Sequence, residues 1–283
     1  MTKLKKNGEP RRQVREGTFG LYTGFAMFGA LVLAGLIVPV ISKYDPNQPG
    51  LPPMAPPSRD YLFGTDVLGR DVFTRVFDAV FIDLGTALIG VSIPLIVGTI
   101  IGTLLGISRN KKINAVVGSL IDGINAFPFL IFVIALIAFI GPGITSIIFA
   151  LSLVNWARYA RIARTRAVVV NHQGYVEAAR TLGYSKARIL FKHIIPNVSS
   201  ETRAYALSDF IIVIIAVAAL SFLGLGAPPP QAEWGAMIRD GNQIFQIAWW
   251  PTIFPGLALC WAGITVAFIA EGLQRRLRET NSK

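Results

Sequence analysis

Cysteine, histidine and charge are all scarce in this chain. Of its 283 residues one is a cysteine and two are histidines, and charged residues make up 15%, against about 25% in an ordinary soluble domain. Cys260 alone excludes an internal disulfide framework and a thiolate-based metal site. His172 and His193 lie in basic polar stretches, which excludes a histidine-ligated metal centre in the apolar part. No Gly-Lys pair occurs either, so the phosphate-binding loop of an ATPase is absent.

Apolar residues, in contrast, are abundant. They make up 53% of the chain, and the mean hydropathy is +0.54. The net charge of +11 comes from 27 Lys and Arg against 16 Asp and Glu. A nucleic-acid binder with this charge would be rich in polar residues, so we expect no nucleic-acid partner. The composition is typical of a membrane protein, and the positive charge needs a membrane explanation.

Membrane spans are predicted by charge-free runs of about 20 apolar residues, the length that crosses a bilayer core of about 30 Å. Four runs are plain, and a longer stretch is divided in two by Gly141-Pro142-Gly143, a sequence that favours a turn. The six predicted spans are 18–42, 84–108, 113–140, 144–157, 210–232 and 241–270.

The distribution of Lys and Arg predicts the orientation of these spans. With six spans and a cytosolic N-terminus, 22 of the 27 basic residues lie on the cytosolic side, as the positive-inside rule requires. If 144–157 were instead a re-entrant segment, most of them would move outside. We therefore expect an all-α polytopic membrane protein with both termini cytosolic. Trp249 and Trp250 would anchor the outer interface.

Five segments follow from this topology. They are a basic cytosolic tail (1–18), the first transmembrane helix (19–42), an external Pro-rich strap with an amphipathic helix (43–83), a transmembrane core (84–272) with a cytosolic loop (158–208), and a cytosolic tail (273–283). In the strap, Asp66 or Thr65 either simply caps the amphipathic helix or belongs to a functional motif of the external face. Trp234, like Trp249, is a candidate interface anchor.

Asp122 is the one charge inside the predicted spans, where a carboxylate costs about 2.5–3.5 kcal/mol on insertion scales. It either faces the bundle interior, paired with Arg158 or Arg161, or lines a pathway or gate. Asn125 and Pro128 are candidates for the same pathway or gate. No partner nucleophile or second acid accompanies Asp122, so we expect no enzyme activity in this chain.

The cytosolic loop begins with arginines that either snorkel to lipid head groups or meet a partner. Beyond them, Tyr175, Ala178 or Ala179, and Leu182 recur at helical spacing and predict a short helix with one apolar stripe. Gly183 is placed to end this helix at positive φ, and Ser185 to open a second helix that ends near Pro196. This helix pair either covers the base of the bundle or docks into a partner.

Three motifs resemble one family. Glu177-Ala178-Ala179, followed by Gly183 and Ile194-Ile195-Pro196, resembles the EAA loop of membrane subunits of binding-protein-dependent ABC importers. Residues 63–73 and the pair 220–226 and 233–237 resemble segments of the C-type subunit of the oligopeptide, dipeptide and nickel group. The likeness runs from about residue 44 to 273. The family's closing Gly-Asp-Gly-Leu is Ala-Glu-Gly-Leu here, at residues 270–273.

The resemblance implies a type I ABC importer permease fold in a bacterial or archaeal cytoplasmic (inner) membrane. It implies as partners a homologous second permease subunit, two ATPase subunits that bind the ATP and Mg, and an external solute-binding protein, with no cofactor in this chain. The solute stays open between peptides, nickel or another metal chelate, and glutathione-like molecules. The alternative class is an ion- or proton-coupled secondary transporter or a channel subunit.

The resemblance also assigns the candidate residues to two surfaces. The residues expected to couple to the ATPase are Glu177, Ala178, Ala179, Gly183 and Pro196. Those of the external-face motif are Asp66, Gly69, Arg70, Asp71, Glu233 and Trp234.

Overall fold

The computed structural model describes residues 9–280, with side chains for 20–273 and 275. Over that range the chain forms helices and loops, with a single isolated bridge between Thr65 and Asp71. Two compact units result, one built from residues up to 81 and from 240 onward, the other from 82–239. The last helix, which the sequence placed with the core, therefore belongs to the first unit. Residues 1–8 and 281–283 of the predicted tails lie outside the described part.

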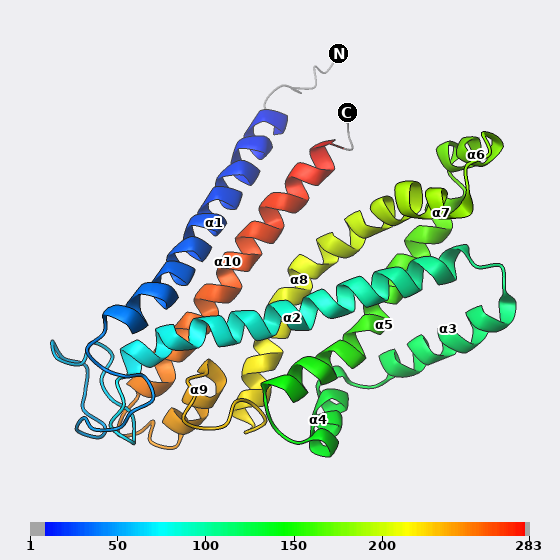
Figure 1. Ribbon diagram of the computed structural model, residues 1–283. Helices are drawn as coiled ribbons and strands as arrows, with labels where there is room; N and C mark the ends of the chain where they lie inside the picture. The colour runs from blue at the N-terminus through cyan, green and yellow to red at the C-terminus, as the bar shows by residue number, and fades with distance from the viewer. Residues whose placement is uncertain (1–8, 281–283) are drawn as a thin grey trace, which may run out of the picture. The chain divides into compact units, whose positions relative to one another are not determined.

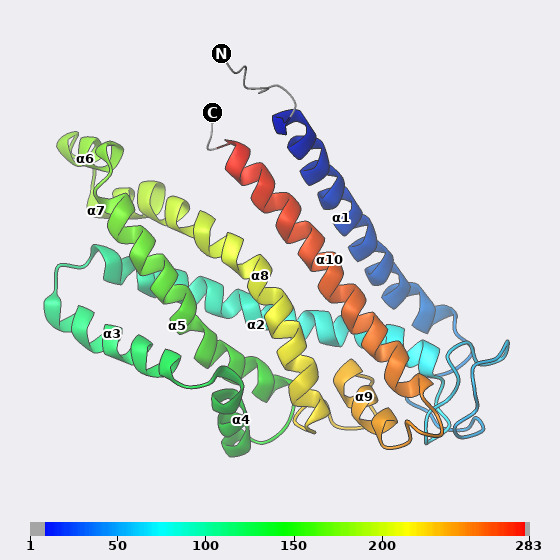
Figure 2. The same ribbon diagram turned by 180° about the vertical axis from the view of Figure 1, so that it is seen from behind.

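The first unit is built on a pair of long helices. α1 (Glu9–Ile41) and α10 (Trp250–Thr280) lie side by side, as both views show (Figures 1 and 2). A Cβ at Gly24 would lie 2.8 Å from the Ile269 side chain, so glycine permits a close approach of the two helices. The strap of residues 42–71 and the first turns of α2 (Val72–Ile107) complete this unit.

The second unit contains the rest of α2 and the central helices. They are α3 (Lys111–Ala126), α4 (Phe129–Ile140), α5 (Ile144–Asn171), α6 (Gly174–Thr181), α7 (Lys186–Ile189), the π-helical turn η1 (Leu190–Ile194), α8 (Ile195–Phe222) and most of α9 (Trp234–Asn242). α5 is the central element, because α3, α4 and α8 all pack on it (Figure 2).

Four described helices have the length and apolar composition of membrane spans: Gly20–Ile41, Val72–Ile107, Lys186–Phe222 and Trp250–Leu273. A fifth is obtained if the bent pair α3 and α4 counts as one span. The chain is thus a multi-pass membrane protein, and the count of six stays a prediction.

The straight helix predicted over 113–140 is wrong. The chain bends by 97° between α3 and α4. Phe127 has an extended backbone (φ −82°, ψ 143°), the conformation favoured before a proline because the ring of Pro128 clashes with a helical predecessor. The second half of the stretch therefore leaves the axis of the first.

The helix end predicted near Pro196 is also wrong. Lys186–Phe222 is continuous, and Pro196 occupies the first turn of α8. Inside a continuous helix a proline removes one i→i−4 hydrogen bond and clashes with the carbonyl four residues before it, and here a π turn directly before Pro196 changes that hydrogen-bond pattern. The preceding π turn, closed by the Ile195 N–H donating to the Leu190 carbonyl, carries the helix into α8. The span predicted over 210–232 accordingly starts far earlier and ends at Phe222.

Glycines bring α2 and α5 into close contact. Gly98, Gly102 and Gly106 recur every fourth residue and so share one face of α2. A Cβ at Gly98 would lie 2.5 Å from the Trp156 carbonyl oxygen, and one at Gly106 2.7 Å from the Arg164 carbonyl oxygen. This is the small-residue packing by which membrane helices approach closely. It fixes α5, which carries the arginines of the candidate site.

Candidate functional site

α6 is attached to its unit by one buried face. Val176 and Ala179 are buried in an apolar cluster with Ile189, Ile194 and Val198 from α7, η1 and α8. The predicted apolar stripe was wrong in its direction, since Tyr175 and Leu182 are exposed by 42% and 73%. The buried face instead follows the i, i+3 pair that meets α5 and α8.

The turn after α6 has the geometry that the sequence predicts. Gly183 has φ +79°, its N–H donates to the Arg180 carbonyl at 3.0 Å, and the Tyr184 N–H donates to the Ala179 carbonyl at 3.1 Å. This is the double hydrogen bond of a Schellman cap. Ser185 then accepts a hydrogen bond from the Arg188 N–H at 3.3 Å and caps α7. The predictions of a positive φ and of a helix start at Ser185 are confirmed.

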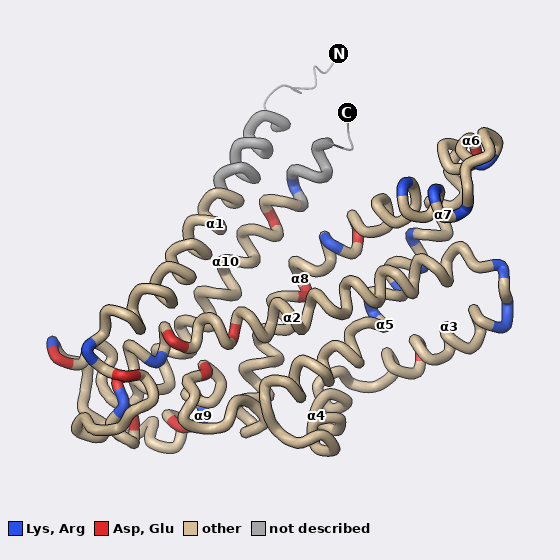
Figure 3. Tube along the Cα trace, in the orientation of Figure 1, with Lys and Arg blue, Asp and Glu red and all other residues tan. Residues whose placement is uncertain are grey.

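The other face of α6 is open to solvent. Glu177 in its first turn and Ala178 beside it are both exposed, and so is Pro196. Lys and Arg gather around α6, α7 and the connection from α2 to α3, as Figure 3 shows. The acidic Glu177 thus lies beside Ala178 on an exposed face with a basic neighbourhood. The small side chain of Ala178 leaves room for a partner to approach the helix there.

A charge pair links α3 to α5. The Arg161 guanidinium donates to the Asp122 carboxylate at 2.7 Å, with the two side chains 54% and 73% exposed. Asn125, one turn along α3, donates to the Ile121 carbonyl of its own helix at 2.7 Å. Pro128 lies at the bend before α4. The Asp122 side chain therefore contacts another helix, whereas the Asn125 side chain bonds within its own helix.

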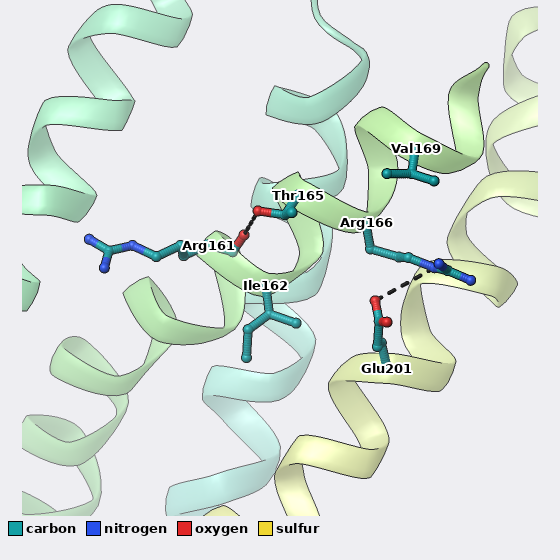
Figure 4. A pocket seen from close by; sticks show the side chains of 6 residues that line it. All are labelled: Arg161, Ile162, Thr165, Arg166, Val169 and Glu201. Carbon is teal, nitrogen blue, oxygen red and sulfur yellow. Dashed lines mark hydrogen bonds and ion pairs between the residues drawn. The ribbon is translucent and has the colours of Figure 1, made fainter. Parts of the chain in front are cut away.

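Next to this pair, an open groove of about 380 Å³ lies between α5 and α8. Figure 4 shows its lining: Arg161, Ile162, Thr165, Arg166, Val169 and Glu201. Arg166 and Glu201 point toward each other, 3.5 Å apart, while Arg161 points away from them (Figure 4). α5 therefore presents cations on two sides, each matched by an acid from a neighbouring helix.

Two buried acids were missed by the sequence analysis, which found Asp122 alone at depth. Asp83 of α2 is fully buried, and Asp209 of α8 is 1% exposed. The Tyr159 hydroxyl donates to Asp209 at 2.8 Å and joins α5 to α8. The predicted charge-free spans began just after each acid, at residues 84 and 210, so the predicted helices were shorter than the observed ones and excluded both acids. No charge-free criterion finds an acid inside a longer helix.

In the first unit, Asp66 organises the turn before α2. Its carboxylate accepts hydrogen bonds from the N–H groups of Leu68 and Arg70, both at 2.9 Å, and from the Arg70 side chain at 2.6 Å. Gly69 has φ +69°, and its carbonyl accepts from the Leu51 N–H at 3.1 Å. The motif therefore fixes the strap from within, since Asp66 and Arg70 are both buried.

The cap of α2 is Asp71, so the expected cap by Thr65 or Asp66 was wrong. The Asp71 carboxylate accepts from the Thr74 N–H at 2.8 Å and from its hydroxyl at 2.7 Å. Thr65 instead donates to the Pro52 carbonyl at 2.6 Å, while its own carbonyl accepts from the Trp250 indole at 3.0 Å. Trp250 is thereby buried, and only its neighbour Trp249 stays exposed as the interface interpretation requires.

In the second unit, Glu233 closes the loop that follows α8. Its carboxylate, 1% exposed, accepts from the Ser221 hydroxyl and from the Ala227 N–H at 2.7 Å. The next residue, Trp234, is fully buried, and its N–H donates to Asp83 at 3.1 Å. Trp234 is therefore no interface anchor. The conspicuous polar residues of this motif hold a loop in place rather than face a solute.

The second unit combines closely packed apolar helices with an exposed helical hairpin that a buried apolar face holds in place. This architecture is that of a helical membrane protein with a surface for a partner, and the family comparison agrees. Residues 98–279 match the family described as "Binding-protein-dependent transport system inner membrane component", and the chain belongs to this family. It is a transport permease that contributes to a translocation pathway, and the family is not one of known enzymes. A secondary transporter or channel subunit is not favoured.

Particular relatives are similar along nearly the whole chain. A putative peptide transport system permease protein of Brucella suis is 34% identical over 93% of this chain and 88% of its own. The dipeptide transport system permease protein DppC of Alkalihalophilus pseudofirmus is 30% identical over 95% and 88%. The oligopeptide transport system permease protein OppC of Bacillus subtilis is 32% identical over 90% and 83%.

Among solved structures, an amino acid ABC transporter chain shares the fold. Its TM-score is 0.54 at 21% identity, and the match covers 71% of this chain and 94% of that one. This likeness supports the permease fold that the sequence motifs predict.

Proposed function

We propose that this chain forms half of the translocation pathway of an ATP-driven, binding-protein-dependent importer of peptides. The other half is a homologous second permease subunit, two ATPase subunits bind ATP and Mg, and an external protein delivers the solute. This chain holds no cofactor. The observation that carries the proposal is the α6 hairpin, which exposes Glu177 and Ala178 on one face and buries Val176 and Ala179 in an apolar cluster on the other. The choice of peptides rests on the names of the relatives.

In this proposal α6 lies on the cytosolic side of the membrane. The end of the second unit that carries α6, α7 and the α2–α3 connection is rich in Lys and Arg (Figure 3), and positive charge favours the cytosolic side. Both termini are then cytosolic, in a bacterial or archaeal cytoplasmic membrane.

Coupling follows from how α6 is held. Val176 and Ala179 pack against α5, α7 and α8, so a push on α6 reaches helices of the unit without a flexible joint. Glu177 offers a charged contact at the helix N-terminus, Ala178 permits close approach, and Gly183 sets the direction of the turn. Closure of the ATPase dimer would move α6 and thereby switch the pathway between opening to the outside and opening to the cytosol.

The pathway itself is proposed to pass the open side of α3 and α5. Asp122 and Arg161 are exposed there, and the groove lined by Arg166 and Glu201 adjoins them. Paired charges across helices can part and re-form as the helices move, because exposed pairs of this kind are worth only about 0–1 kcal/mol.

The test of the coupling role uses Glu177→Lys and Gly183→Val in the assembled complex. Gly183→Val places a β-branched residue at φ +79°, a strain of about 1–3 kcal/mol that misdirects the turn. Both variants should insert normally but lose co-purification with the ATPase subunits or lose solute-stimulated ATP hydrolysis.

Two control variants separate coupling from general damage. Gly183→Asn keeps a residue type that tolerates the left-handed conformation where a Cβ meets nothing within 4 Å, and Lys192→Glu changes an exposed charge nearby. Both should keep ATPase stimulation. Full stimulation and transport in the Glu177→Lys/Gly183→Val double variant would refute the proposal. Binding of candidate peptides to the cognate external protein tests the solute separately.

A further inference from the structure

Two hollows of the first unit lie along one stripe of α1. The deeper one, of about 320 Å³, includes Ala30 and Ala34 in its lining, and the shallower one, of about 250 Å³, includes Val38 and Ser42. Ala30, Ala34 and Val38 recur at intervals of four, so they form one row on the surface of α1, and Ser42 follows directly after the end of the helix. The two hollows therefore follow each other along α1.

The deeper hollow accepts only hydrocarbon. Phe63, Phe77, Leu257 and Trp261 line its walls with the alanines of α1. The Trp261 indole is the one polar side-chain group among its lining residues, and it already donates to the Met27 carbonyl at 3.2 Å. A polar ligand would lose its hydration here without gaining a hydrogen bond.

The shallower hollow is charged. Lys43, Arg59 and Asp60 line it, and all three are exposed. Asp71 borders it too, but its carboxylate is already occupied by Thr74. Two cations and one available acid thus face the same space.

Aromatic rings form the boundary between the hollows. Phe73 borders the shallow hollow, and its ring lies 4.8 Å from that of Phe63 and 5.0 Å from that of Phe77, both of which border the deep one. The hollows are therefore adjacent, separated by about one ring.

Depth in the membrane matches this division. The apolar span of α1 ends at Ile41. Ala34 and Ala30 precede that end by 7 and 11 residues, so at 1.5 Å per residue they lie about 10–16 Å deeper along the helix. The charged hollow, next to Ser42 and Lys43, is at the level of lipid head groups, and the apolar hollow is at the level of acyl chains.

We propose that the two hollows together bind one glycerophospholipid with an ammonium head group, such as phosphatidylethanolamine. Lys43 and Arg59 hold the phosphate, Asp60 accepts from the ammonium, and one acyl chain occupies the deep hollow. Two cations against one available acid match a phosphate with an ammonium beside it. This inference concerns the first unit alone and does not rest on the proposed function.

The experiment uses the purified complex in nanodiscs that contain phosphatidylethanolamine with a photoreactive diazirine in its acyl chain. Ala34→Trp should lower labelling of residues 254–261 about tenfold, because the indole excludes about two or more acyl methylenes. Leu33→Trp is the matched control, since Leu33 is exposed and lines neither hollow, and it should leave labelling unchanged. Ala30→Phe repeats the test if Ala34→Trp does not assemble.

The head-group assignment is tested with the same acyl probe on phosphatidylglycerol and phosphatidylcholine, neither of which has an ammonium that donates hydrogen bonds. Both should label several-fold less than phosphatidylethanolamine. Lys43→Glu with Arg59→Glu should lower labelling about fivefold or more, whereas Lys111→Glu with Lys112→Glu should not.

Three results would overturn the proposal. The first is labelling of Ala34→Trp or Ala30→Phe that equals labelling of the wild type. The second is equal labelling by the lipids with the three different head groups. The third is zero-length cross-linking that joins the residues of the hollow to a second permease chain instead of to lipid.

Discussion

Replacing Gly98 by alanine should loosen the contact between α2 and α5. The new methyl group would lie 2.5 Å from both the Trp156 carbonyl oxygen and the Tyr159 Cβ, whereas ordinary contact begins at 3.4 Å. The difference between these distances means that the helices must separate locally by about 0.9 Å. A gap of that size forfeits a quarter to a half of each van der Waals contact.

The expected loss follows from these contacts. On the order of 40 atom pairs at about 0.15 kcal/mol each would lose about 1.5–3 kcal/mol, in agreement with the usual cost of overpacking. Alanine regains about 0.5–1 kcal/mol over glycine as a helix former. The free energy of unfolding should therefore fall by about 0.5–2.5 kcal/mol.

Gly85→Ala is the matched control. It lies in the same helix, and a Cβ there meets nothing within 4 Å, so it should raise the free energy of unfolding by about 0.5–1 kcal/mol. Unfolding by SDS in mixed micelles, followed by tryptophan fluorescence, measures both. Equal changes of the same sign in the two variants would refute the reasoning that Gly98 is needed for close approach.

Three further predictions concern other parts of the chain. Asp122→Asn should transport nearly normally and Asp122→Leu poorly, because the amide still accepts from Arg161; normal uptake by both would show that the carboxylate has no role. Glu233→Leu should lower the free energy of unfolding by about 1–3 kcal/mol, since two buried donors lose their acceptor, and Glu233→Gln should lower it by less. If thermal denaturation ranks the two variants the other way, the Glu233 carboxylate does not hold the loop through these hydrogen bonds. Ser185→Cys on a Cys260→Ser background should resist labelling from outside intact cells, and rapid external labelling would reverse the proposed orientation.

The parts of the candidate site that depend on neighbouring residues in the chain could be predicted from the sequence. Gly183 and Ser185 lie next to the helices that they end and begin, so the turn needed no knowledge of distant contacts. The face of α6 was different. Ala178 and Ala179 are adjacent, and either fits an apolar stripe, so the sequence leaves two stripes possible. Contacts with α7 and α8 bury Ala179 and expose Ala178.

Proline illustrates why the fold was only partly predictable. Pro128 bends the chain by 97°, α2 passes through Pro94, and α8 carries Pro196 in its first turn. The residue type is the same in all three. Before Pro196 the π turn supplies a bond from the Ile195 N–H to the Leu190 carbonyl, whereas before Pro128 the backbone is extended and the helix ends. A propensity rule has no access to those partners.

The glycine row of α2, in contrast, could be predicted from the sequence. Its fourfold spacing is visible in the sequence, and it marks the face that meets α5.

The π turn between α7 and α8 also sets an angle. A π turn holds one residue more than the α-helical turn that it replaces, and one residue of an α-helix corresponds to about 100° of rotation. The turn at Leu190–Ile194 therefore determines the direction in which the α6 hairpin projects around the axis of α8. Deleting one residue within it would restore an ordinary helix and preserve the register of everything downstream. The α6 hairpin would then project in a different direction around the axis of α8. The number of residues in this segment therefore determines the direction in which the exposed face of α6 points.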